Sequence, residues 1–173
     1  MHSKELKILV VLDAIVRQES VRATIDSIVP RVEQKLTQDS KASLAWEAVP
    51  LGTYGKKLPD VIRSSWVFVL RARTSTGAER HPNSHQRMMS YKGRGDLQIW
   101  NGNEWSSNLL ESGLHLEIEK KWLSVPPNVW HQAVVPETNW TVISFHTVPE
   151  NELVEERTDP ADSRLIRQRR YSP

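Results

Sequence analysis

The feature that most constrains the fold is a series of short β-type runs that begins near residue 43. Each run is rich in β-branched, aromatic or alternating apolar residues, and turn-forming Gly, Pro and Asn separate the runs. Short strands at such regular spacing predict an all-β sandwich or barrel. The runs span residues 44–51, 65–73, 86–93, 95–100, 114–125 and 139–148.

Residues 3–38 carry a helical pattern instead. Ser3 is expected to cap a first helix that runs to about Gln18, and Ser20 is expected to cap a second. Pro30 interrupts the second pattern, which predicts two short helices or one kinked helix. We interpret this start as a helical hairpin packed on the main domain or on a partner subunit. A DNA-reading helix-turn-helix is the alternative, but it lacks a visible basic recognition helix. The apolar face of the second helix would hold Val21, Ile25, Ile28, Val29, Val32 and Leu36.

The length of 173 residues suits one main domain with appendages. We divide the chain into a helical segment (1–40), a β domain (41–150) and a polar C-terminal tail (151–173) that wraps the surface or frays. The net charge of +2 does not indicate nucleic-acid binding. The absence of cysteine excludes disulfides and thiolate sites and is compatible with a reducing cytoplasm. The apolar run 8–16 is too short to span a bilayer. We therefore expect a cytoplasmic protein with no nucleic-acid or membrane partner.

The stretch 79-ERHPNSHQ-86 gathers residue types that bind metals. Residues two apart in a strand share a face, so Glu79 and His81 would offer a carboxylate and an imidazole to the same ion. A buried Glu79 needs a cationic partner, which Arg71, Arg73 or a metal could supply.

A second element, 126-PPNVWH-131, delivers a histidine from a separate hairpin. Asn128 tolerates the left-handed conformation that such a turn often needs, and His131 follows just inside the next strand. Ligands from one strand cannot surround an ion, so convergence of His81 and His131 is what a metal site here requires.

These two segments resemble the two motifs of the cupin superfamily of small β-barrels. The first motif reads H-x-H, a short spacer, E, six residues and G; the second reads P-x-G-x-x-H. Asn128 replaces the glycine of the second motif, and Gly93 matches that of the first. The resemblance covers about residues 43–148 and implies an antiparallel cupin barrel (jelly roll) that forms a homodimer. It implies a divalent metal ion (Fe, Mn, Ni or Zn) held where His, His, Glu and His normally stand, here Glu79, His81, Gln86 and His131.

Three functions are compatible with this ligand set. The first is a metal-dependent enzyme (an oxygenase, isomerase or decarboxylase) that acts on a small organic molecule. The second is a non-catalytic metabolite-binding or sensor module without metal, which the replacements at Glu79 and Gln86 favour. The third, ranked last, is a metal-free epimerase or isomerase with His81 or His131 as general base.

The alternation of side chains along a strand predicts which of the remaining candidate residues face the interior and which face outward. His85 is expected to face outward, and Met88 shares the inward parity of Gln86. His146 is interpreted as a hydrogen-bonded core histidine, with completion of the pocket as the alternative. Trp130 is expected to face away from the pocket, because it lies next to His131, and most tryptophans are expected to pack in the core.

Overall fold

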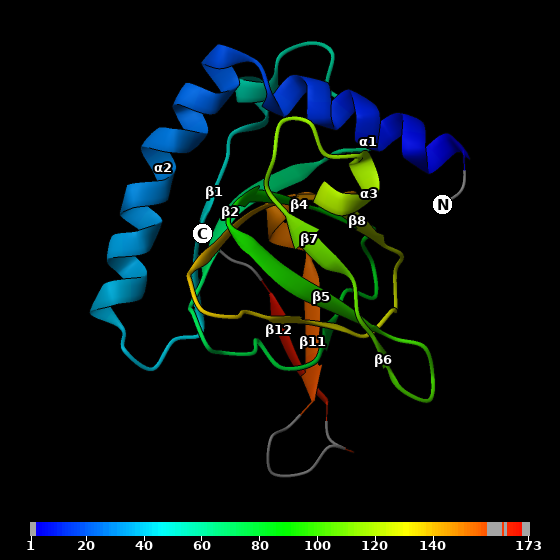
Figure 1. Ribbon diagram of the computed structural model, residues 1–173. Coiled ribbons are helices and arrows are strands. Elements are labelled where there is room, and N and C mark those ends of the chain that lie inside the picture. The colour runs from blue at the N-terminus through cyan, green and yellow to red at the C-terminus, as the bar shows by residue number, and fades with distance from the viewer. Residues whose placement is uncertain (1–2, 159–163, 165, 171–173) are drawn as a thin grey trace.

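The chain begins with two helices, α1 (Ser3–Val16) and α2 (Glu19–Gln38), that lie against one side of a mostly β structure (Figure 1). This computed structural model describes residues 3–158, 164 and 166–170. The predicted helical hairpin is confirmed, but the predicted cap was wrong: α2 starts at Glu19, one residue before Ser20, and Gln18 occupies the N-cap position. Pro30 lies inside one continuous helix rather than between two.

The first sheet is antiparallel, with strand order β1-β2-β10-β4-β8. Its strands are β1 (Leu44–Ala48), β2 (Ser64–Leu70), β10 (Trp140–His146), β4 (Gln86–Lys92) and β8 (Trp122–Val125). Alternate residues of these strands face the helices, where Val67, Ile143 and Phe145 pack against the apolar residues of α1 and α2. The apolar face of the hairpin is therefore buried within its own chain.

The second sheet runs β12-β11-β3-β9-β5-β6, and β7 also pairs with β5. Its strands are β12 (Ile166–Arg170), β11 (Val154–Thr158), β3 (Glu79–Arg80), β9 (His131–Val134), β5 (Arg94–Trp100), β6 (Trp105–Ser106) and β7 (Leu109–Glu111). Short helices η1 (Leu51–Tyr54), α3 (Ile118–Lys121) and η2 (Glu150–Glu152) complete the fold.

The two sheets face each other across a shared apolar core. Leu70, Met88 and Trp140 of the first sheet pack with Leu97 and Ala133 of the second. The predicted antiparallel β fold is confirmed as two packed sheets, and no strand pairing joins them within the described residues. Trp140 is fully buried, as expected for a core tryptophan.

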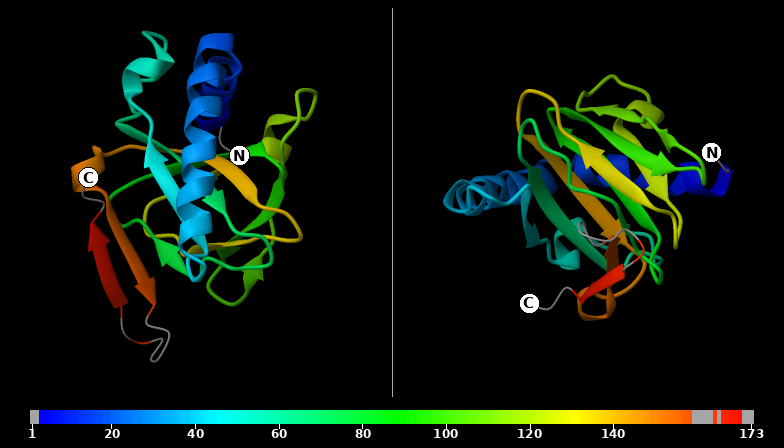
Figure 2. Two further views of the ribbon diagram at one scale, coloured as in Figure 1. Left: turned by 90° about the vertical axis from the view of Figure 1, so that its left-hand side faces the viewer. Right: turned by 90° about the horizontal axis from the view of Figure 1, so that it is seen from below.

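Two regions differ from the sequence-based expectation. Of the run 114–125, only Trp122–Val125 is a strand, because residues 118–121 form α3. The segment 151–173 was expected to be a tail, yet it contributes β11 and β12, and β11 pairs directly with β3. Figure 2 shows these two strands at the edge of the molecule, away from α1.

None of the helices in the described part of the chain combines the length and the apolar character that crossing a membrane requires.

Candidate metal centre

Strand pairing brings the two sequence motifs together. Glu79 in β3 lies directly opposite His131 in β9. The turn before β9 is fixed to the first motif, because the Asn128 N–H donates a 3.1 Å hydrogen bond to the His81 carbonyl. Asn128 has the predicted left-handed conformation, with φ of 64°. The turn thus sets both the direction of β9 and its distance from the first motif.

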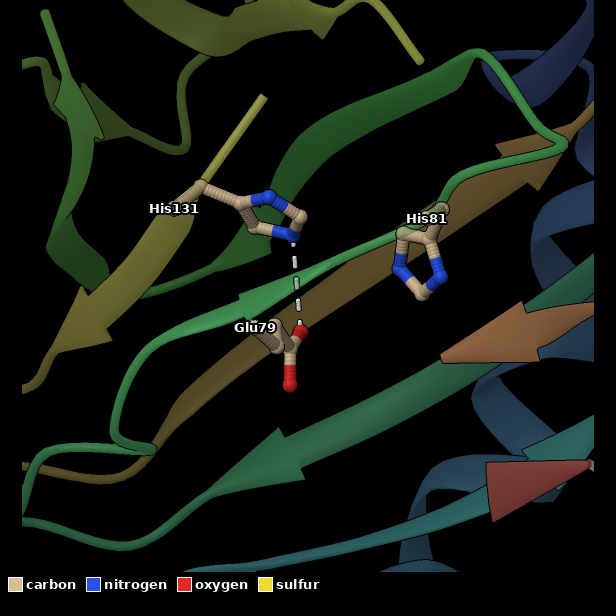
Figure 3. A group of neighbouring side chains, drawn as sticks. All are labelled: Glu79, His81 and His131. Carbon is tan, nitrogen blue, oxygen red and sulfur yellow. Dashed lines mark ion pairs between the residues drawn. The ribbon is translucent and has the colours of Figure 1, made fainter. Parts of the chain in front are cut away.

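Glu79, His81 and His131 converge on one point between the sheets (Figure 3). One potential ligand atom from each residue lies within 4.8 Å of the others. His81 and His131 are buried, with 4% and 1% of their surface exposed. The predicted convergence of the two histidines from separate hairpins is therefore present.

Backbone carbonyls fix the tautomers of both rings. Nδ1 of His131 lies 3.0 Å from the Val129 carbonyl, and Nδ1 of His81 lies 3.2 Å from the Val154 carbonyl. A carbonyl only accepts, so each Nδ1 carries a proton and each neutral ring keeps its lone pair at Nε2. Metal-binding histidines in proteins are commonly oriented by such a contact at the second nitrogen.

The Nε2 atom of His131 is buried, finds no hydrogen-bond partner in the described part of the chain, and lies 3.5 Å from Oε1 of Glu79. In the neutral ring this places two hydrogen-bond acceptors opposite each other. Such a contact is stable only when a proton or a cation lies between the two atoms.

Burial and the neighbouring charges together set the pKa values of Glu79 and His81. Burial alone would raise the pKa of Glu79, but its contacts with His131 and Arg157 lower the pKa to about 2. Burial lowers the pKa of His81 to about 4, and repulsion from His131 acts in the same direction. At neutral pH the site therefore presents an ionised carboxylate and a neutral His81 ring, which are the protonation states that bind metals.

Arg157 in β11 is a neighbour of the site that sequence reasoning missed. Its Nη2 pairs with Oε2 of Glu79, and its Nε pairs with the buried Glu155. Arg71, Arg73 or a metal ion was expected to supply this charge, and the structure shows that Arg157 does so instead of either of those two arginines. The Arg71 guanidinium instead donates to backbone carbonyls at the end of α2 and just beyond it. A strand pattern in residues 154–158 was the only signal in the sequence that could have pointed to Arg157.

Gln86 lies deeper in the same interior. It lines a cavity of about 20 Å³ together with Glu79, and its Nε2 donates a 3.1 Å hydrogen bond to Oγ of Ser144. Its Oε1 is buried and has no hydrogen-bond partner among the described residues. The structure thus brings the fourth predicted residue to the site without showing that it binds an ion.

His146 is a hydrogen-bonded core histidine, as the sequence indicated. Its Nδ1 lies 3.1 Å from Oγ of Ser84 and its Nε2 lies 2.9 Å from Oγ of Ser144. Its ring contacts the His81 ring edge-on, with the centroids 4.8 Å apart. Because both nitrogens are occupied, His146 supports the His81 ring rather than offering a lone pair.

The residues expected to face outward do so. His85 contacts Oγ of Ser124 at 2.6 Å and lies 3.8 Å from Glu5 of α1, on the helix-covered side of the first sheet. Trp130 points away from the site and stacks under the Arg80 guanidinium, 4.7 Å from the ring centroid.

The donor set fits a divalent ion of the first transition series. Two imidazoles and one carboxylate are a recurrent set for such ions in proteins. Metal bonds to nitrogen and oxygen are about 2.0–2.2 Å, so two ligand atoms of one ion lie at most about 4.4 Å apart. The three side chains would have to approach by a few tenths of an ångström, and the orphaned Nε2 of His131 is already aimed at the shared point.

Comparison with solved structures identifies the fold. Pumpkin seed globulin and the recombinant pro-11S globulin of pumpkin each align over 68% of this chain, with a TM-score of 0.51 and 16% identity. An oxalate oxidase in complex with glycolate aligns over 64% of this chain and 54% of its own, with a TM-score of 0.48 and 14% identity. This chain spans only 28% of the globulins' length. Neither the protein-family models nor the curated proteins gave a match by sequence. The chain therefore shares the fold of the two pumpkin globulins over the aligned part.

Proposed function

We propose that this protein is a metal-dependent cupin enzyme that acts on a small organic molecule. Glu79, His81 and His131 would hold a divalent ion, with Gln86 as a weaker fourth ligand. The observation that carries the proposal is the 3.5 Å contact between the lone-pair nitrogen of His131 and a carboxylate oxygen of Glu79.

The chain's own residues would prepare such a site. The carbonyls of Val129 and Val154 orient the two imidazoles, and Arg157 keeps Glu79 ionised. When bound, the ion would supply Lewis-acid or redox chemistry suited to an oxygenase, an isomerase or a decarboxylase. The sheets would form the wall of one flattened barrel, and apolar side chains around the ion would exclude water.

A metal-free binding module is the second candidate, and one observation favours it. Glu79 already has a cationic partner in Arg157, and a doubly protonated His131 would complete an ion-paired cluster without metal. In that case the cavity would bind a metabolite without catalysing a reaction.

Metal analysis of untagged protein separates the two candidates. The enzyme proposal expects about one divalent ion per chain, lost in both His81→Ala and His131→Ala. His115→Ala is the matched control, because His115 is exposed and outside the site. Circular dichroism of each variant would verify folding. A wild-type protein that takes up no Fe, Mn, Ni or Zn supports the binding module, and metal retained in both site variants contradicts the ligand assignment.

We further propose a small molecule, rather than nucleic acid or a membrane, as the binding partner, and a homodimer in solution. Light scattering of the purified protein would test the homodimer, and a monomeric mass at micromolar concentration would contradict it.

A further inference from the structure

The outer face of the second sheet carries a hollow that lies apart from the candidate metal centre. Along β9, His131 and Ala133 face the interior between the sheets, so Val134 faces outward. Asp96 of β5 lies directly opposite Val134 on one side and directly opposite Leu109 of β7 on the other. Residues that are directly opposite on paired strands share a face of the sheet. Val134, Asp96 and Leu109 therefore form a row on the outer face.

This row is the floor of a pocket of about 590 Å³. Leu116 and Lys120 also line it, from the segment that contains α3, and α3 packs beside β7 (Figure 1). The volume lies within the range of sites that hold small organic molecules. Leu109 is 74% exposed, so much of this apolar side chain is in contact with water in the free protein.

The size and the charge of the lining favour a small neutral molecule as the occupant. Ten residues line the pocket, whereas a stable protein interface uses about 20–30 residues on each side. The lining holds two cations, Arg94 and Lys120, and two acids, Asp96 and Glu111, so its formal charges cancel. Arg94 lies directly opposite Glu111, and both carboxylate oxygens of Asp96 already accept hydrogen bonds. The pocket therefore offers apolar surface to a ligand rather than a net charge.

We infer that this outer pocket is a binding site for a neutral, largely apolar small molecule. Binding would remove the side chains of Leu109 and Val134 from water, and this removal is the main source of affinity in an apolar site. The ligand would lie on the opposite face of β9 from His131. The inference therefore goes beyond the proposed function and does not depend on it.

Fluorescence titration with N-phenyl-1-naphthylamine, a neutral apolar probe, tests the inference. We expect about one probe molecule to bind per chain. Leu109→Ser and Leu116→Ser should each weaken binding about ten-fold or more, because each removes a leucine that the probe would cover. Leu109 is mostly exposed, so its replacement leaves the core intact. The matched control is Val61→Ser, which removes an exposed apolar side chain outside the pocket and should bind the probe as the wild type does.

A charged analogue tests the neutral ligand class. Anilinonaphthalene sulfonate has the same aromatic body with an added sulfonate, and we expect it to bind no more tightly than the neutral probe. Tighter binding of the sulfonate, with loss of that binding in Lys120→Gln, would overturn the assignment of a neutral ligand.

Three other results would overturn the site itself. The first is a wild type that does not bind the neutral probe, or that binds it no more tightly than Leu109→Ser does. The second is binding that a chelator abolishes, since this would place the probe at the candidate metal centre. The third is a dimer, measured by light scattering, that Leu109→Ser converts to a monomer, since the face would then be a subunit interface.

Discussion

The buried ring of His81 predicts how the stability of the metal-free protein depends on pH. Burial lowers the pKa of this ring from 6.5 to about 4. In the unfolded chain the ring would be exposed and would bind a proton near its ordinary pKa of about 6.5. Between these two values the unfolded state binds a proton that the folded state does not. The contribution of His81 to the free energy of unfolding is therefore fully present above about pH 6.5, and it is lost as the pH is lowered toward 4.

The size of this effect follows from the two pKa values. One pKa unit corresponds to about 1.4 kcal/mol, so acidification from about pH 7 to about pH 4 should remove about 3 kcal/mol through His81. His81 is only 4% exposed, so solvent screening reduces this figure little. A loss of this size is a large part of the 5–15 kcal/mol by which typical proteins are stable.

Urea denaturation at a series of pH values, with a chelator present, would measure the effect. His81→Gln replaces the ring with a polar group that does not titrate. Its free energy of unfolding should fall by about 3 kcal/mol less than that of the wild type over this pH range. Burial, the largest cause that lowers the pKa of His146, acts in both proteins. The control His115→Gln should follow the wild type, because His115 is exposed. Parallel curves for wild type and His81→Gln would refute the idea that the fold keeps His81 neutral.

Three further predictions concern the site and the core. Burial would raise the pKa of Glu79, but its ionic contacts lower the pKa to about 2. The contribution of Glu79 to stability is therefore present above about pH 4.5 and is lost on acidification. Between about pH 5.5 and pH 3, urea titrations should show that the free energy of unfolding of Glu79→Gln falls by about 2 kcal/mol less than that of the wild type. Gly95→Ala would place a Cβ 2.1 Å from the buried Trp140 ring, so we expect about 1–3 kcal/mol of destabilisation in thermal unfolding, and an unchanged melting temperature would contradict this packing. Asp13→Ala would leave the buried Lys121 ammonium without its 2.6 Å partner and should cost about 3–5 kcal/mol by urea denaturation; Asp13→Asn, which keeps one hydrogen-bond acceptor, should cost less.

Much of the fold was predictable because its signals are local. The six β-type runs each contain a strand of the structure, and the two helices start and end within a few residues of the expected positions. Pro30 left two short helices or one helix open, because a proline interrupts one turn of hydrogen bonds. The structure has one helix, since the apolar face of α2 continues on both sides of Pro30 and packs on the sheet. Tertiary packing thus determined the continuity of this helix.

The site was predictable only in part, because its components come from different levels of structure. Glu79, His81 and His131 were accessible through strand parity and motif spacing. The contact to Arg157 was not, since it depends on a pairing between segments separated by more than seventy residues. Nothing in the local sequence around Arg157 specifies that β11 pairs with β3.

The departures from the cupin motif acquire a physical meaning once that strand is considered. The usual motif places its carboxylate where Gln86 stands, while this chain carries the carboxylate at Glu79, so the ligand set keeps one negative charge in a different place. Gln86 lies between two strands of the first sheet, whereas Glu79 lies one strand away from β11 and within reach of Arg157. The same strand supplies the Val154 carbonyl that orients His81. The carboxylate at Glu79 therefore links the candidate metal centre to the C-terminal strands through Arg157. In this chain the candidate ligand set therefore depends on β11, which holds both Glu79 and the His81 ring in place.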